Sequence, residues 1–173
     1  MYGVSSGGSL VLETAIKLRD KVKKLSLYEH PYKSGENSLE EWREYTRPLK
    51  ELLDADSRGD AVALFMRFVG TPADQIEGVR KAPMWSMFEA VAPTLLYDAF
   101  AMGVDCSGPV ERVLRINATT LVMHGGASLP FMKQTALTLS KAIPNAKFRT
   151  IEGQTHAVAS EVIAPVLVEF FKS

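Results

Sequence analysis

The stretch Gly3-Val4-Ser5-Ser6-Gly7-Gly8 decides how this chain is expected to fold. It reads G-x-S-x-G with one further glycine, and a segment of helical periodicity follows it. Glycines around a serine let a strand bend sharply into a helix, because side chains at those places would collide with the turn. The serine at such a bend takes a strained backbone conformation. The sequence therefore predicts a strand–turn–helix unit that presents Ser5.

Segments with strand and helix patterns alternate at both ends of the chain. An apolar stripe predicts a helix over residues 8–22. Alternating or continuous apolar runs predict strands over residues 24–30, 118–124 and 147–152. Further amphipathic helices are expected over residues 131–143 and 157–171.

The middle of the chain, residues 32–108, has a different character, with short helical segments rich in methionine and aromatic residues. Pro48 is expected to kink or break a helix over residues 42–53. Asp60 is expected to cap a helix over residues 61–69. The methionines and aromatic residues fit either the core of these helices or the wall of an apolar substrate pocket.

The composition is that of an ordinary globular protein, and it excludes several classes of partner. The 173 residues are 46% hydrophobic and 23% charged, with Lys plus Arg equal to Asp plus Glu at 20 each. This balance gives no sign of a surface for nucleic acid or anionic membrane. The start of the chain has no signal-peptide pattern, and no apolar run approaches the ~20 residues that span a bilayer. With Cys106 as the single cysteine, we expect a cytoplasmic protein.

The glycine–serine turn near one end and Gln154-Thr155-His156 near the other resemble the α/β-hydrolase superfamily. The resemblance covers most of the chain, but residues 32–108 are similar to the superfamily only in forming a helical cap region. It implies the C-terminal part of an α/β-hydrolase fold, with about three parallel strands flanked by helices and a helical cap insertion. Residues 1–31 would form the elbow with its helix and strand, residues 32–108 the cap, and residues 109–173 the C-terminal core.

The resemblance also implies a role for three residues. Ser5 would be the nucleophile, because a hydroxyl attacks an acyl carbonyl once a base takes its proton. His156 would be that base, since it follows the last expected strand, where the superfamily places its histidine. The backbone N–H of Ser6, the residue after the nucleophile, would form half of the oxyanion hole.

The acid of the triad is the open point. In the superfamily it normally follows the strand that here ends at His124, but residues 125–130 contain no carboxylate. Glu29, at the end of the preceding strand, is the candidate substitute. Its side chain can alternatively be interpreted as a solvated charge at a strand end. Asp98 and Asp105 are further candidates. We interpret His30 and His124 as structural, and we expect no metal site because neither has ligand spacing with another histidine, a cysteine or an acid cluster. No cofactor is expected either.

These features lead to two hypotheses about function. The first is a serine hydrolase that cleaves small, apolar carboxylic esters. The second is a non-catalytic, truncated hydrolase-like protein that self-associates or binds a ligand or partner. The superfamily has further strands before the elbow, so the first strand of this chain would expose an unpaired edge. We therefore expect a homo-oligomer formed through that edge.

Overall fold

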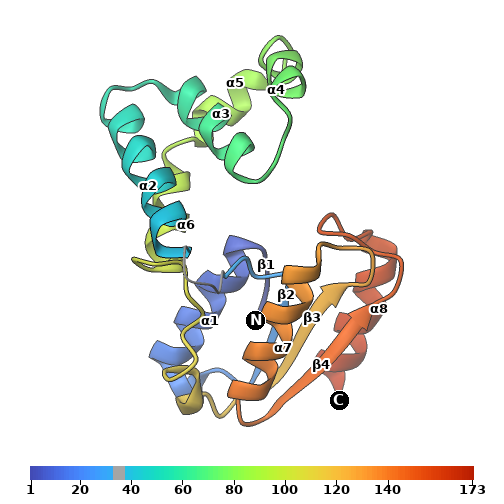
Figure 1. Cartoon of the computed structure of the whole chain (residues 1–173). Coiled ribbons are helices and arrows are strands. Elements are labelled where there is room, and N and C mark those ends of the chain that lie inside the picture. Colours follow the sequence, from blue (N-terminus) through green and yellow to red (C-terminus); the bar gives the residue numbers. More distant parts are fainter. Residues whose placement is uncertain (33–37) are drawn as a thin grey trace. The chain divides into compact units, whose positions relative to one another are not determined.

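The computed structural model describes residues 1–32 and 38–173. The chain divides into two compact units, which are coloured along the sequence in Figure 1. The sheet unit comprises Met1–Ser34 and Ser107–Ser173, and the helical unit comprises Gly35–Cys106. No helix among the described residues is both long and apolar enough to cross a membrane.

A parallel four-stranded sheet in the order β1-β2-β3-β4 forms the centre of the sheet unit. Its strands are β1 (Tyr2–Val4), β2 (Lys24–Tyr28), β3 (Thr119–Gly125) and β4 (Ala146–Ile151). The expected α/β fold class is confirmed. The sequence predicts about three strands, but the sheet has four, because the strand end before the Ser5 turn forms β1. β1 pairs with β2, so the expectation that the strand over residues 24–30 would be the unpaired edge is wrong. β1 lies at one edge of the sheet, and self-association through that edge stays a prediction.

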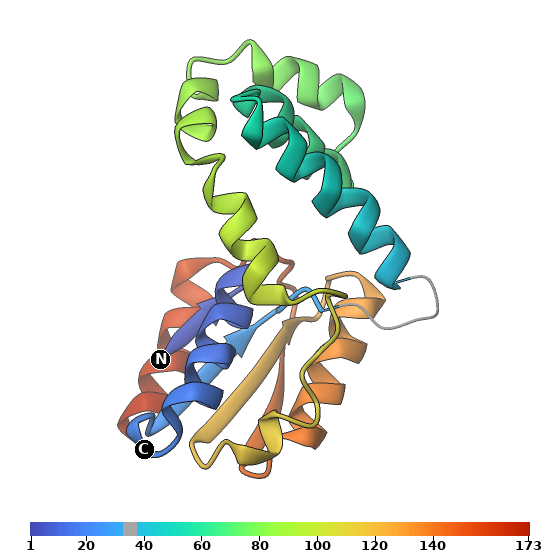
Figure 2. The ribbon, with the colours of Figure 1, turned by 90° about the vertical axis from the view of Figure 1, so that its left-hand side faces the viewer.

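The register brings the carboxyl ends of neighbouring strands to the same edge of the sheet (Figure 2). Val4 pairs with Tyr28, and Tyr28 pairs in turn with Met123. On the last pair of strands, Gly125 lies opposite Ile151. Residues that directly follow these strands therefore gather at one edge, which is where open α/β sheets bind their ligands.

Helices cover both faces of this sheet. They are α1 (Ser6–Leu18), α7 (Pro130–Ala142) and α8 (Ser160–Lys172), with short 3₁₀ turns at Arg19–Lys21 and Val113–Arg115. One face packs against α1 and α7 through a buried cluster that includes Leu12, Leu27 and Leu139. The opposite face packs against α8 through a cluster that includes Met123 and Ile163. Alternate side chains of each strand thus enter different cores, which holds the carboxyl edge rigidly.

The helical unit contains five α-helices within its described part. They are α2 (Ser38–Asp54), α3 (Arg58–Phe68), α4 (Ala73–Arg80), α5 (Trp85–Val91) and α6 (Thr94–Met102). Its core gathers buried side chains from α2, α3 and α6, among them Trp42, Leu49 and Met102. The indole Nε1–H of Trp42 donates a hydrogen bond of 2.9 Å to the carbonyl of Gly103, just past the end of α6.

Two expectations about these helices need correction. A break at Pro48 is wrong, because α2 runs through this proline to Asp54, and a kink there stays a prediction. Tyr45 and Leu49, on either side of this proline, are both buried, so tertiary packing outweighs the lost backbone hydrogen bond. Asp60 does not cap its helix. α3 begins earlier, after Ser57, and Asp60 lies in its first turn.

Candidate active site

Ser5 lies at a sharp bend between β1 and α1, as the sequence predicts. Its backbone angles are φ 53° and ψ −133°, which a residue with a side chain rarely adopts. Two backbone hydrogen bonds hold this conformation. The N–H of Ser5 donates to the carbonyl of Tyr28 at 3.0 Å, and the carbonyl of Ser5 accepts from the N–H of Gly8 at 2.9 Å. The strain is thus supported by the neighbouring strand and by the first turn of α1.

The bend depends on its glycines to different degrees. A Cβ atom added at Gly3 would lie 2.3 Å from the carbonyl oxygen of Gly7, so no side chain fits there. At Gly8 the nearest atom would be the Cβ of His30 at 3.3 Å, which is a tight contact. An added Cβ at Gly7 would meet nothing within 4 Å. The steric requirement expected of all three glycines therefore holds for Gly3 and Gly8 and is wrong for Gly7.

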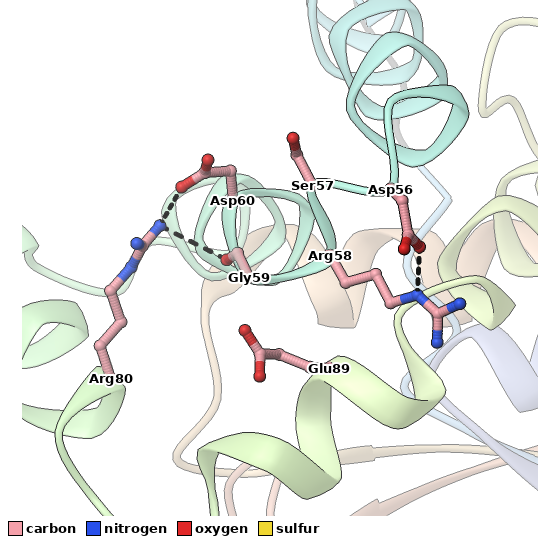
Figure 3. A pocket seen from close by; sticks show the side chains of 7 residues that line it. All are labelled: Asp56, Ser57, Arg58, Gly59, Asp60, Arg80 and Glu89. Atoms are coloured by element: carbon pink, nitrogen blue, oxygen red, sulfur yellow. Dashed lines mark hydrogen bonds and ion pairs between the residues drawn. The ribbon is translucent and has the colours of Figure 1, made fainter.

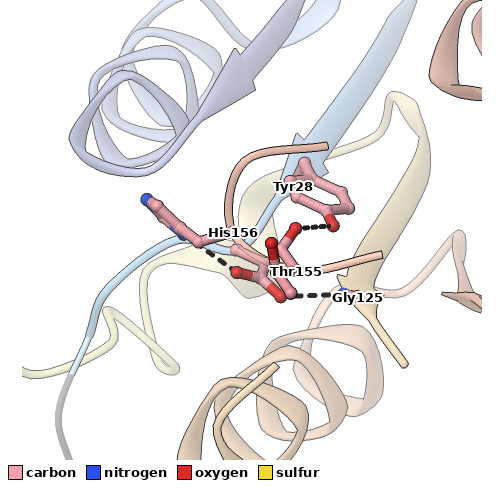
Figure 4. A network of polar contacts seen from close by, with 5 residues as sticks. Tyr28, Gly125, Thr155 and His156 are labelled. Carbon is pink, nitrogen blue, oxygen red and sulfur yellow. Dashed lines mark hydrogen bonds and ion pairs between the residues drawn. The ribbon is translucent and has the colours of Figure 1, made fainter. Parts of the chain in front are cut away.

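Glu29 and His156 are in direct contact. Glu29 directly follows β2, and its side chain is fully buried. Its Oε2 lies 2.8 Å from Nδ1 of His156, and its Oε1 accepts a 2.8 Å hydrogen bond from the N–H of Gly125 (Figure 4). One carboxylate at the end of β2 therefore binds both the end of β3 and the loop that follows β4.

The surroundings of Glu29 favour its charged form. Burial raises the pKa of this carboxyl, but the hydrogen bonds from His156 and Gly125 outweigh burial and hold the pKa below its ordinary value. An ionised carboxylate only accepts hydrogen bonds, so Nδ1 of His156 carries the proton that is shared with Glu29. In the neutral imidazole, Nε2 is then the free base. The His156 side chain is 49% exposed, so that it can meet a ligand.

Backbone contacts hold the loop that carries His156. The hydroxyl of Tyr28 donates a 2.6 Å hydrogen bond to the carbonyl of Thr155 (Figure 4). The carbonyl of Gln154 accepts a 2.9 Å hydrogen bond from the N–H of Ala127. A Cβ atom at Gly125 would lie 2.3 Å from the same Gln154 carbonyl oxygen, so this glycine lets strand and loop approach each other. The position of His156 is therefore set from the ends of both β2 and β3.

The structure places the other candidate residues from the sequence, Ser6, Asp98 and Asp105, in α1 and in the helical unit. Ser6 is the first residue of α1, where a backbone N–H has no acceptor within the helix. Asp98 and Asp105 belong to the helical unit, whereas the carboxylate that contacts His156 is that of Glu29. Across the described residues, no hydrogen bond joins the Ser5 hydroxyl to His156. Such bonds are often long in an unliganded enzyme and shorten when substrate binds.

The remaining histidines lie in the interior. His30 is buried, and burial lowers its pKa to about 4, so that its ring is neutral at pH 7. Neither of its ring nitrogens has a hydrogen-bond partner among the described residues. Nε2 of His124 lies 2.9 Å from the hydroxyl of Thr150, and its ring stacks on Phe148. Within residues 1–32 and 38–173, no group of three or more His, Cys, Asp or Glu side chains is placed to hold a metal ion.

The sequence patterns did not reveal two members of this arrangement, Tyr28 and Gly125. A tyrosine at the end of a strand is typical of core packing, and nothing in the sequence marks its hydroxyl as a donor to a distant loop. In the sequence, Gly125 stands out only as the start of a loop without a carboxylate. The close approach of Gln154 gives the reason for a glycine, and this approach is visible only in three dimensions.

A separate cavity of about 420 Å³ lies in the helical unit, around the start of α3 (Figure 3). Its lining is mostly charged: Asp56, Ser57, Arg58, Gly59, Asp60, Arg80 and Glu89. The charges largely neutralise each other, because Arg58 pairs with Asp56 and Arg80 pairs with Asp60. The lining contains neither histidine nor cysteine.

Comparison with known proteins shows which solved structures are similar to this chain. No protein-family model matches the chain, and no curated protein matches it either. Among solved structures, an α/β hydrolase from Sphaerobacter thermophilus DSM 20745 is 42% identical with a TM-score of 0.82, over 98% of this chain and 66% of that one. This chain thus spans slightly less than two thirds of that protein.

More distant structures show the same fold. An acetylester hydrolase from Corynebacterium glutamicum is 18% identical with a TM-score of 0.67, over 99% of this chain and 60% of that one. A bromoperoxidase from Bacillus anthracis is 18% identical with a TM-score of 0.61, over 99% of this chain and 66% of that one. The parallel sheet, the strained serine turn and these structural neighbours lead to one conclusion: the chain belongs to the α/β-hydrolase superfamily.

Proposed function

We propose that the protein is a serine hydrolase that cleaves carboxylic esters, with Ser5 as nucleophile, His156 as base and Glu29 as acid. The observation that carries this proposal is the 2.8 Å contact between His156 Nδ1 and the buried Glu29 carboxylate. This contact lies at the same sheet edge as the strained Ser5 turn. A nucleophile, a base and a group that orients the base are the parts that acyl transfer requires.

The chemistry follows from the proton positions. Nε2 of His156 takes the hydroxyl proton of Ser5 while the oxygen of Ser5 bonds to the acyl carbon. The carbonyl oxygen becomes an oxyanion, and the backbone N–H of Ser6 stabilises it. The C–O bond to the leaving alcohol then breaks, and His156 returns the proton to that alcohol. Water, activated by His156, releases the carboxylic acid and restores Ser5.

The ester class is inferred from residue chemistry. Serine at the bend favours acyl transfer, whereas displacement chemistry in this superfamily uses an aspartate there. The helical unit by itself is rich in methionine and aromatic residues, and it exposes Met87 and Phe100 at 70% and 72%. Adaptable methionine and flat aromatic side chains suit contact with apolar ligands of varied shape.

Labelling with a fluorophosphonate tests this proposal, because the probe reacts covalently only with an activated serine. The purified chain is expected to take up the probe, and Ser5→Ala is expected to abolish labelling. Ser86→Ala, at an exposed serine of the helical unit, serves as the matched control and should label as the wild type does. A folded wild type that takes no label, or Ser5→Ala that labels like the wild type, would overturn the proposal.

A further inference from the structure

We propose that Tyr28 is a positioning residue for this reaction, whose hydroxyl fixes the backbone before His156 so that the imidazole stays against Glu29. The inference rests on the proposed function, because it assigns a role to Tyr28 within the same site. Among the described residues, the Tyr28 hydroxyl donates its hydrogen bond to the carbonyl of Thr155, and no hydrogen bond joins it to the Ser5 hydroxyl or to the imidazole. Tyr28 therefore acts through another residue and is not itself catalytic.

The contacts of Tyr28 and Glu29 point to a double attachment of His156. Tyr28 is the last residue of β2, and Glu29 directly follows it. The Tyr28 hydroxyl holds the carbonyl of Thr155, which belongs to the peptide bond that precedes His156 (Figure 4). Glu29 holds the ring nitrogen of His156 itself. One end of β2 thus fixes the backbone and the side chain of the same histidine.

The environment of the Tyr28 hydroxyl keeps it a hydrogen-bond donor. Burial raises the pKa of this hydroxyl, and the adjacent Glu29 charge raises it further, so that it stays protonated at any pH at which the enzyme would work. The space around it is closed, since a Cβ atom at Gly125 would lie 2.7 Å from the Tyr28 oxygen. The hydroxyl is therefore held between the end of β3 and the loop that carries His156.

Packing and hydrogen bonding by Tyr28 can be separated. Its ring belongs to the buried cluster that faces α8, together with Met123 and Ile163. Tyr28→Phe keeps this ring and removes only the hydroxyl, so the core contacts remain. The carbonyl of Thr155 would then lose the donor that holds it, and the loop would have freedom to shift the imidazole. Small displacements of a catalytic group have large kinetic effects, since a shift of about 1 Å can cost about 100-fold in rate.

The test compares Tyr28→Phe with Tyr2→Phe. Tyr2, on β1, packs against the same cluster and serves as the matched control. With p-nitrophenyl acetate as the probe, Tyr28→Phe is expected to lower kcat about 10- to 100-fold with little change in KM. Tyr2→Phe is expected to keep the wild-type kcat. In proton NMR spectra, the imidazole Nδ1–H of His156 should exchange faster with water in Tyr28→Phe and stay unchanged in Tyr2→Phe.

The two readouts distinguish failure of this inference from failure of the proposed function. If the wild type does not turn over but Tyr28→Phe still changes the Nδ1–H resonance, positioning of His156 stands and the esterase proposal falls. If the wild type is active and Tyr28→Phe keeps both kcat and the resonance, positioning by Tyr28 is overturned. A wild-type measurement is independent of whether the variant folds: the Tyr28 hydroxyl proton should exchange slowly and show an Overhauser contact to the backbone of His156. Absence of that contact would also overturn the inference.

Discussion

Replacing Glu29 with glutamine is expected to lower turnover of p-nitrophenyl acetate by about 10⁴-fold, the loss typical when an amide replaces the acid of such a triad. In the proposed triad, the carboxylate accepts a hydrogen bond from the Nδ1–H of His156 and thereby leaves Nε2 as the base. An amide can turn its NH₂ group toward Nδ1, which then favours the imidazole with its proton on Nε2. That form cannot take the proton of Ser5. The measurement is kcat in the wild type and in Glu29→Gln.

Glu152→Gln provides the control for this experiment. Glu152 directly follows β4, and its side chain is exposed. Glu152→Gln removes one negative charge from the loop that carries His156, and it leaves the contact between Glu29 and His156 in place. We expect turnover close to that of the wild type. Equal turnover in Glu29→Gln and the wild type would show that this carboxylate is not the acid of the site.

Stability is expected to fall in mild acid because of His30. The ring is buried, and its folded-state pKa is lowered from 6.5 to about 4. Below about pH 6.5 the unfolded chain binds a proton that the folded chain excludes, so the folded state loses stability as the pH falls from 6.5 toward 4. A shift of this size corresponds to a loss on the order of 3 kcal/mol once the pH lies below both pKa values. Urea unfolding at pH 7 and pH 5 should show a clear decrease in unfolding free energy.

His30→Leu identifies the source of this pH dependence. No hydrogen bond to the ring nitrogens is lost in this variant, because they have no partner among the described residues. In His30→Leu, the unfolding free energy should depend less steeply on pH between pH 7 and pH 5 than it does in the wild type. Glu29 does not interfere in this window, since its lowered pKa makes its own loss of stability begin only below about pH 4.5. The same slope in both proteins would rule His30 out.

The sequence carried enough information to predict much of this site. The glycines around Ser5 indicate a bend whose steric reason is local, since Gly3 approaches Gly7 only four positions away. Glu29 became a candidate acid because the loop after His124 has no carboxylate. The roles of Ser5, His156 and Glu29 stay predictions. The structure adds that Glu29 lies against His156.

Other features depend on contacts that no local pattern reports. β1 has three residues, too few to show the alternation that marks a strand, and it forms only because β2 lies beside it. The helix through Pro48 persists because buried neighbours hold it. The hydroxyl of Tyr28 meets Thr155 across 127 positions of sequence. Periodicity and capping rules describe neighbours along the chain, so they miss contacts of this kind.

The closed space around Gly125 has a consequence for recognising other proteins with this arrangement. Because that glycine, the Tyr28 hydroxyl and the Gln154 carbonyl fill one small volume, they can change only together. The arrangement would be recognised by three features of the sequence taken together. They are a Tyr-Glu pair at the end of one strand, a glycine at the end of the next strand, and a histidine two residues after the residue whose carbonyl lies against that glycine. Chains that share all three features are expected to keep their acid on the earlier strand, and chains with a bulkier residue in place of Gly125 are expected to carry it elsewhere.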